Sequence, residues 1–106
     1  MVFVEASLFS KALPTYLSDD AYRSLQAHLV ERPDAGALIQ HSGGVRKIRW
    51  SARGKGKSGG VRVIYYWEKT ADQIFMLTLY GKGEKEDLSS ADLRKVVRLL
   101  AEITDG

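Results

Sequence analysis

The 106-residue chain contains no cysteine and only two histidines. The missing cysteines exclude disulfides, thiolate catalysis, zinc ribbons and iron–sulfur clusters, and two histidines do not supply a metal site by themselves. No apolar run approaches the roughly 20 residues of a membrane-spanning helix, and the first residues lack the basic start and long apolar stretch of a secretory signal. We therefore expect one domain over residues 1–106, located in the cytoplasm, with no cofactor and no metal.

Acidic residues are missing from the middle of the chain. The segment from His41 to Trp67 carries seven lysines and arginines and no Asp or Glu, whereas the net charge of the whole chain is +3. Like charges concentrated in this way repel one another, and a protein tolerates this most readily where a polyanion binds. The segment therefore predicts a nucleic-acid partner, with a merely solvated basic loop as the alternative.

Hydrophobic periodicity predicts an α+β fold. Apolar residues recur at helical spacing over 8–16, 21–29 and 93–103, and Ser18 and Ser89 are suited to cap the second and third of these helices. β-Branched and aromatic residues predict strands at 2–4, 45–50, 60–67 and 73–80, with a brief strand at 37–39. We expect a central antiparallel sheet, with the N-terminal helices and the C-terminal helix laid over one face.

Alternation along the strands sorts the cations by face. In the first long strand Lys47 and Arg49 share a face with Val45, while Arg46 points to the other side. On the next strand Arg62 is flanked by apolar residues, and a charged side chain is costly to bury in a core. We therefore expect Arg62 to emerge on an open sheet face or into a cleft, with an edge salt bridge as the alternative.

Two glycine-rich segments carry further cations. Residues 54–60 match G-x-G-x-x-G but lead into a strand instead of a helix, so we interpret them as a loop whose lysines meet phosphates. After the third long strand, Tyr80 offers a ring for base stacking, and Lys82 and Lys85 offer ammonium groups for phosphate. The alternative is a solvated turn on which these lysines pair with the neighbouring glutamates.

Four blocks in this order resemble the RelE superfamily of toxins, and within it the HigB-type branch of bacterial toxin–antitoxin systems. The blocks are GVRKIRWS at 44–51, GKGKSGG at 54–60, VRVIYY at 61–66 and YGKGEKEDL at 80–88. The resemblance covers nearly the whole chain and implies a small microbial RNase fold that enters the A site of the 70S ribosome and cuts messenger RNA. It also implies neutralisation by a cognate antitoxin, which in this branch is usually a helix-turn-helix protein of the HigA type.

The resemblance also implies which residues act. Metal-free cleavage by the 2′-OH needs a base, positive charge on the pentavalent phosphate and an acid for the leaving 5′-oxygen. Lys47 and Arg49 match the basic pair of the family, and Arg62 matches its strand arginine, the expected transition-state clamp. Lys82 matches a basic residue of the motif that follows the strand. The residues expected to hold RNA are Arg46, Arg53, Lys55, Lys57, Tyr80 and Lys85.

The sequence departs from the family pattern at two places. Gly83 stands where some relatives carry an arginine thought to be the acid, and Ser89 and Ser90 stand where some carry a tyrosine. Lys82 is then the first candidate for the acid, and Lys85 is the second. These departures leave two alternatives to a nuclease: a translation inhibitor that binds RNA or the ribosome without cutting, and a module whose basic face docks an acidic partner.

Overall fold

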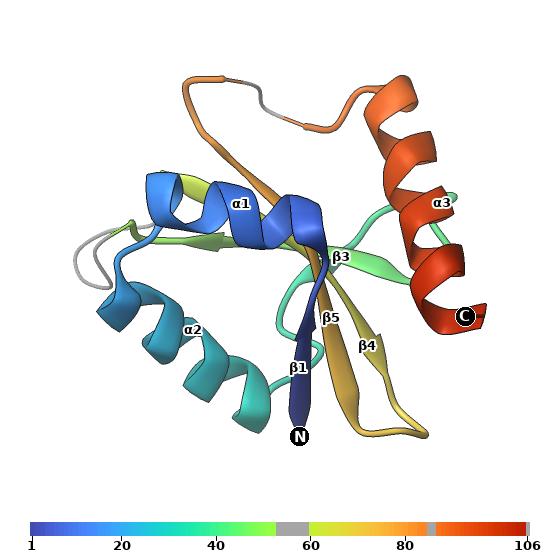
Figure 1. Cartoon of the computed structure of the whole chain (residues 1–106), viewed down its shortest axis with the longest axis horizontal. Coiled ribbons are helices and arrows are strands. Elements are labelled where there is room, and N and C mark those ends of the chain that lie inside the picture. The colour runs from blue at the N-terminus through green and yellow to red at the C-terminus, as the bar shows by residue number, and fades with distance from the viewer. Residues whose placement is uncertain (53–59, 85–86, 106) are drawn as a thin grey trace.

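The elements follow the predicted order. The structure is a computed structural model that describes residues 1–52, 60–84 and 87–105, and in this part it has a five-stranded sheet and three helices (Figure 1). The elements are β1 (Val2–Glu5), α1 (Ser7–Tyr16), α2 (Asp19–Glu31), β2 (Ala37–Leu38), β3 (Val45–Trp50), β4 (Val61–Glu68), β5 (Gln73–Gly81) and α3 (Ser90–Asp105). The predicted α+β class is confirmed.

Serine caps fix where α2 and α3 begin. The Ser18 Oγ accepts a hydrogen bond from the Ala21 N–H at 3.0 Å, and the Ser89 Oγ accepts one from the Asp92 N–H at 3.0 Å. Each cap satisfies a backbone donor that the first helical turn leaves without an intrahelical partner. Both predicted caps are confirmed, so the starts of these helices are encoded locally.

The strand order in the sheet is β1-β5-β4-β3-β2. The strands β3, β4 and β5 form the predicted antiparallel meander, and β2 joins β3 in the antiparallel sense. The first strand, however, pairs with β5 in parallel, with Val2 opposite Gln73 and Glu5 opposite Met76. The prediction of a wholly antiparallel sheet is wrong at this edge. Because no hairpin joins β1 to β5, the local sequence does not constrain the direction in which β1 is added.

Helices cover both faces of the sheet (Figure 1). On one side, the α1/α2 face, helices α1 and α2 pack their apolar residues around Phe9 and Leu25. On the other side, the α3 face, helix α3 packs around Val96 and Leu100. The prediction that all helices lie over one face is wrong, because β4 is buried on both sides from Val61 to Tyr65 and needs cover on each.

The chain between α2 and β3 is held to the sheet by two side chains of the α1/α2 face. The Tyr65 hydroxyl donates to the Pro33 carbonyl and accepts from the Gly36 N–H, each at 2.8 Å, and burial raises the pKa of this hydroxyl. The Arg46 guanidinium donates to the carbonyls of Gly36 at 2.7 Å and of Asp34 at 3.1 Å. Arg46 therefore has a structural function at this position.

Candidate active site

A row of three side chains crosses the α3 face of the sheet. The register places Arg49 of β3 opposite Arg62 of β4, and Arg62 opposite Tyr80 of β5. Directly opposed residues of adjacent strands point to the same face, with Cβ atoms about 5 Å apart. Tyr80 belongs to the same buried cluster as Val96 of α3, so all three residues lie on the α3 face. We call these three residues the cation row, after the two arginines that it contains.

A β-bulge brings Tyr80 into the cation row. The register between β4 and β5 shifts between Ile64 and Tyr65. On β5, Leu77 and Tyr80 both belong to the cluster on the α3 face, whereas Leu79 belongs to the α1/α2 cluster. Strict alternation would put Leu77 and Leu79 on one face and turn Tyr80 to the other. The irregularity therefore changes the face that the end of β5 presents.

Lys47 lies two residues before Arg49, on the same face, and forms an ion pair with Asp87. The hydrogen bond from Lys47 and then its charge lower the pKa of the Asp87 carboxyl, and the charges of Arg49 and Arg62 act in the same direction. Asp87 was not among the predicted site residues, because this acid lies in the connection between β5 and α3, far along the chain from β3. Its position in the fourth block of the family resemblance was the available signal.

Arg62 is buried, with an exposed fraction of 3%. Of the two predicted positions for Arg62, the open sheet face is wrong, because β4 is the central strand and Arg62 has Arg49 and Tyr80 as direct neighbours on its two sides. The other, a cleft, stays a prediction. Arg49, in contrast, is exposed. Removing the whole Arg62 side chain would therefore disturb packing as well as charge, so a functional test needs a variant that keeps most of its volume.

The other predicted site residues occupy different surroundings. Lys82 is exposed in the turn after β5, where its N–H donates to the Gly60 carbonyl at 2.7 Å. Tyr80 has an exposed fraction of 4%, so its ring is not presented as an open platform for base stacking. Arg46 lies opposite Tyr65 on the α1/α2 face, away from the cation row. Four predicted RNA-binding residues lie outside the described residues: Arg53, Lys55, Lys57 and Lys85.

The turn that carries Lys82 is fastened to α1. The Glu84 carboxylate accepts a hydrogen bond from the Gly81 N–H at 2.8 Å and one from the Tyr16 hydroxyl at 2.5 Å. The Glu84 N–H in turn donates to the Gly81 carbonyl at 3.1 Å. The bond to Glu84 raises the pKa of the Tyr16 hydroxyl, and burial adds to the effect. These contacts fix the start of the β5–α3 connection relative to α1.

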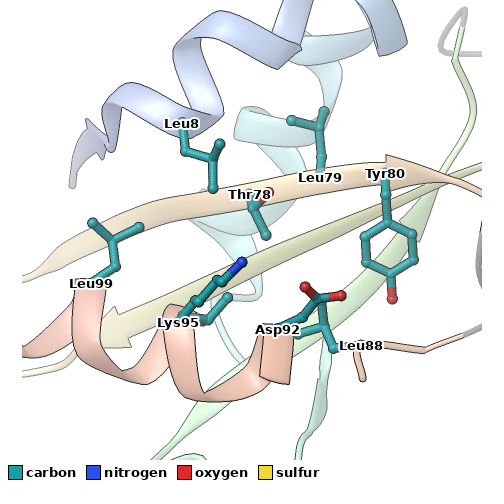
Figure 2. Close-up of a pocket in the computed structure, with 9 residues that line it drawn as sticks. Leu8, Thr78, Leu79, Tyr80, Leu88, Asp92, Lys95 and Leu99 are labelled. Atoms are coloured by element: carbon teal, nitrogen blue, oxygen red, sulfur yellow. The ribbon is translucent and has the colours of Figure 1, made fainter. Parts of the chain in front are cut away.

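A cavity of about 310 Å³ lies beside the β5 end of the cation row, between α1, β5 and α3 (Figure 2). Tyr80 lines it, and Leu8 and Leu99 contribute apolar walls. The side chains of Asp92 and Lys95 extend from α3 toward β5 (Figure 2). The row therefore ends next to open space, in which part of a bound molecule has room.

Two other kinds of site have no counterpart in the part of the chain that the structure describes. There, no group of three or more His, Cys, Asp or Glu side chains is arranged to hold a metal ion. Each helix of the described residues is also too short or too polar to cross a lipid bilayer.

The family model described as the RelE toxin of the RelE / RelB toxin–antitoxin system matches residues 18–105. This chain belongs to the RelE toxin family. Members of the RelE family are generally endoribonucleases. The matched residues run from the cap of α2 to the end of α3 and so include the whole cation row.

Two solved structures show the RelE fold of the chain. A mutant of the E. coli toxin RelE in the free state is 16% identical, with a TM-score of 0.59, and the match covers 92% of this chain and 94% of that one. The archaeal RelE–RelB complex from Pyrococcus horikoshii is 21% identical, with a TM-score of 0.53, and the match covers 79% of this chain and 97% of that one. The predicted RelE-like fold is confirmed, and the HigB-type branch stays a prediction.

Proposed function

We propose that this RelE family member is a ribosome-dependent endoribonuclease that cuts messenger RNA in the A site and thereby inhibits translation. The observation that carries the proposal is the cation row, together with Lys47 on the same face of the sheet. A phosphodiester crossing this face would meet cationic groups from two adjacent strands. Membership of the RelE toxin family supports the same conclusion.

The chemistry follows from the charge of the row. When the 2′-oxygen of RNA attacks the adjacent phosphorus and the bond to the 5′-oxygen breaks, negative charge increases on the phosphoryl oxygens in the transition state. Arg62 is buried, and a cation in a region of low dielectric stabilises such charge more strongly than one in water. Arg62 is therefore the proposed transition-state clamp, and the exposed Arg49 beside it binds the same phosphate.

Proton transfer is assigned to the two lysines. Lys47 is the proposed base for the 2′-OH, because it lies on the face of the row and neighbours Arg49. Lys82 is the proposed acid for the leaving 5′-oxygen, since it is exposed just beyond the β5 end of the row. No metal takes part in this scheme.

The proposed partners are an antitoxin, the 70S ribosome and messenger RNA. The archaeal RelE–RelB complex shows a protein of this fold assembled with RelB, and we propose a comparable antitoxin partner here. The resemblance of the sequence to the HigB-type branch makes a helix-turn-helix antitoxin of the HigA type the more specific proposal. The basic segment from His41 to Trp67 supports the RNA partners.

Primer extension on a defined message in a reconstituted translation system tests the proposed function. Purified protein is added with and without ribosomes, and Arg49→Gln is compared with Arg23→Gln, a change of an exposed arginine on α2. We expect cuts on translated message alone, lost in Arg49→Gln and retained in Arg23→Gln. Arrest of translation without new RNA ends would contradict cleavage and favour a binder that does not cut.

A further inference from the structure

Asp87 places a carboxylate among the cations of the proposed active site. Its carboxylate pairs with Lys47, and Arg49 and Arg62 contribute to the lowered pKa of the acid, so all three charges act on this group. A phosphodiester bound at the same place would meet the same cations. Both groups carry a negative charge and present oxygen acceptors to lysine and arginine.

We propose that Asp87 is an internal substitute for the RNA phosphate: its carboxylate occupies the anion position beside Lys47 and the cation row, and RNA displaces it on binding. The inference rests on the part of the proposed function that assigns phosphate binding to the row. It does not require that the bound RNA is cut.

The accessibility of the pair suits an exchange of anions. Asp87 has an exposed side-chain fraction of 73%, and it lies in the connection between β5 and α3, outside any helix or strand. Lys47 and Asp87 also border a hollow of about 250 Å³, which gives an incoming anion access to the pair. Exposed ion pairs are weak, whereas an RNA backbone makes several charge-assisted contacts at once. A polyanion can therefore replace the carboxylate.

A different function for Asp87 would be to position Lys47. The relative exposure of the two side chains argues against this function, because Lys47 has an exposed fraction of 22% and Asp87 one of 73%. The carboxylate is therefore the outer, more exposed member of the pair. A positioning group would support the ammonium group from the protein side. The two functions predict opposite effects of removing the charge of Asp87 on the affinity for RNA.

Binding of an RNA that cannot be cut separates these functions. Fluorescence anisotropy with a labelled, fully 2′-O-methylated oligonucleotide measures the Kd at about 0.1 M salt, where charges more than about 10 Å apart are screened. We expect Asp87→Asn to bind about 3- to 5-fold more tightly than the unmodified protein, because one weak competing ion pair is removed. The matched control is Asp20→Asn, which removes an acid from another exposed ion pair, on α2, and we expect its Kd to stay within about 1.5-fold.

The other outcomes of this experiment overturn the proposal. Equal tightening in both variants would mean that net charge alone matters, weaker binding by Asp87→Asn would mean that the acid positions Lys47, and an unchanged Kd would mean that the acid does not compete. In a Lys47→Gln background, we expect Asp87→Asn to give a smaller gain, and an undiminished gain would place the effect elsewhere. Because the probe cannot be cut, tighter binding without cleavage of a natural message would overturn the proposed nuclease function only.

Discussion

The two faces of the sheet use arginine in opposite ways. Arg46 and Arg62 lie on adjacent strands, and both come from the same acid-free segment. On the α1/α2 face, Arg46 donates to two backbone carbonyls and holds the chain before β3. On the α3 face, Arg62 stands in the middle of the cation row. Strand alternation, and not local composition, therefore decides which of these cations bonds to the backbone and which can meet a substrate.

The two faces of the sheet also differ in how completely helices cover them. Two helices pack on the α1/α2 face, and that cluster contains the fully buried Phe9, Leu25 and Leu29. One helix packs on the α3 face, where the cavity beside Tyr80 and the hollow beside Lys47 border it. One face therefore supplies most of the hydrophobic core, and the other leaves part of the sheet accessible for binding.

Separate substitutions of Arg62 and Arg46 should differ most in their effect on cleavage. Arg62→Gln should lower the rate of message cleavage by about 10²- to 10³-fold, because a cation directed at the transition state is lost. Arg46→Gln should keep the rate within about 3-fold and should lower the free energy of unfolding by about 1 kcal/mol, because it weakens bonds to backbone carbonyls. Primer extension gives the rates, and urea unfolding gives the stability of each variant.

One result would contradict this prediction for the two arginines. Equal losses of cleavage in the two variants, at equal stability, would remove the functional distinction between the faces. Circular dichroism before each assay would show that Arg62→Gln is folded, which is needed because the residue is buried.

The sequence predicted the elements well, because their signals are local. The caps at Ser18 and Ser89 and the alternation of β3 and β4 depend on residues within a few positions of one another. The common face of Lys47 and Arg49 was therefore predicted, because alternation within one strand is enough, whereas the position of Arg62 on the same face depends on the register between β3 and β4.

The predictions that failed, and the features that were not predicted, depend on contacts between residues far apart in the sequence. The parallel pairing of β1 and the placement of α3 on the second face are choices of partner, which no local pattern encodes. The burial of Arg62 follows from its neighbours on both adjacent strands, and the pairing of Asp87 with Lys47 joins residues far apart in the chain. The bulge was also missed, although it brings Tyr80 into the row.

Two adjacent tyrosines give the next largest effect. Tyr65→Phe removes the hydroxyl that bonds to Pro33 and Gly36, and it leaves the Gly36 N–H without this acceptor. We expect the free energy of unfolding to fall by about 1–3 kcal/mol. Tyr66→Phe, on the other face, keeps the ring that stacks on Phe75, and its effect should stay within about 0.5 kcal/mol. Urea unfolding measures both, and similar losses would contradict the assignment of the structural tyrosine to the α1/α2 face.

The contact between α1 and the turn after β5 links the two faces. Tyr16→Phe removes the hydrogen bond to Glu84 and should loosen the turn that carries Lys82. We expect cleavage to fall about 2- to 4-fold, in line with the loss of one hydrogen bond, while the affinity for uncleavable RNA changes less. Single-turnover cleavage and anisotropy separate the two quantities. An equal loss in Glu84→Gln, which keeps an acceptor oxygen, would mean that charge and not the bond matters.

The smallest effect is a difference in pH dependence between the faces. Burial, followed by a hydrogen bond to Glu5 at 2.7 Å, raises the pKa of Tyr22 on the α1/α2 face, whereas Lys47 lowers the pKa of Asp87 on the α3 face. The unfolded tyrosine ionises near pH 10 while the folded one keeps its proton, so the stabilisation is complete well below pH 10 and declines as the pH approaches and passes 10. The Asp87 contribution is present at neutral pH and is lost only as the pH falls through the lowered pKa.

The alkaline part of this difference can be measured with one substitution. Urea unfolding between pH 8 and 10.5 should show a fall in the free energy of unfolding, of which Tyr22 accounts for about 0.4 kcal/mol at pH 10. Tyr22→Phe should lower stability at pH 8, because the bond to Glu5 is lost, and should flatten the alkaline fall by this amount. A slope that stays the same in Tyr22→Phe would assign the alkaline fall to the other tyrosines whose pKa is raised, Tyr16 and Tyr65, both of which also pack in the α1/α2 cluster.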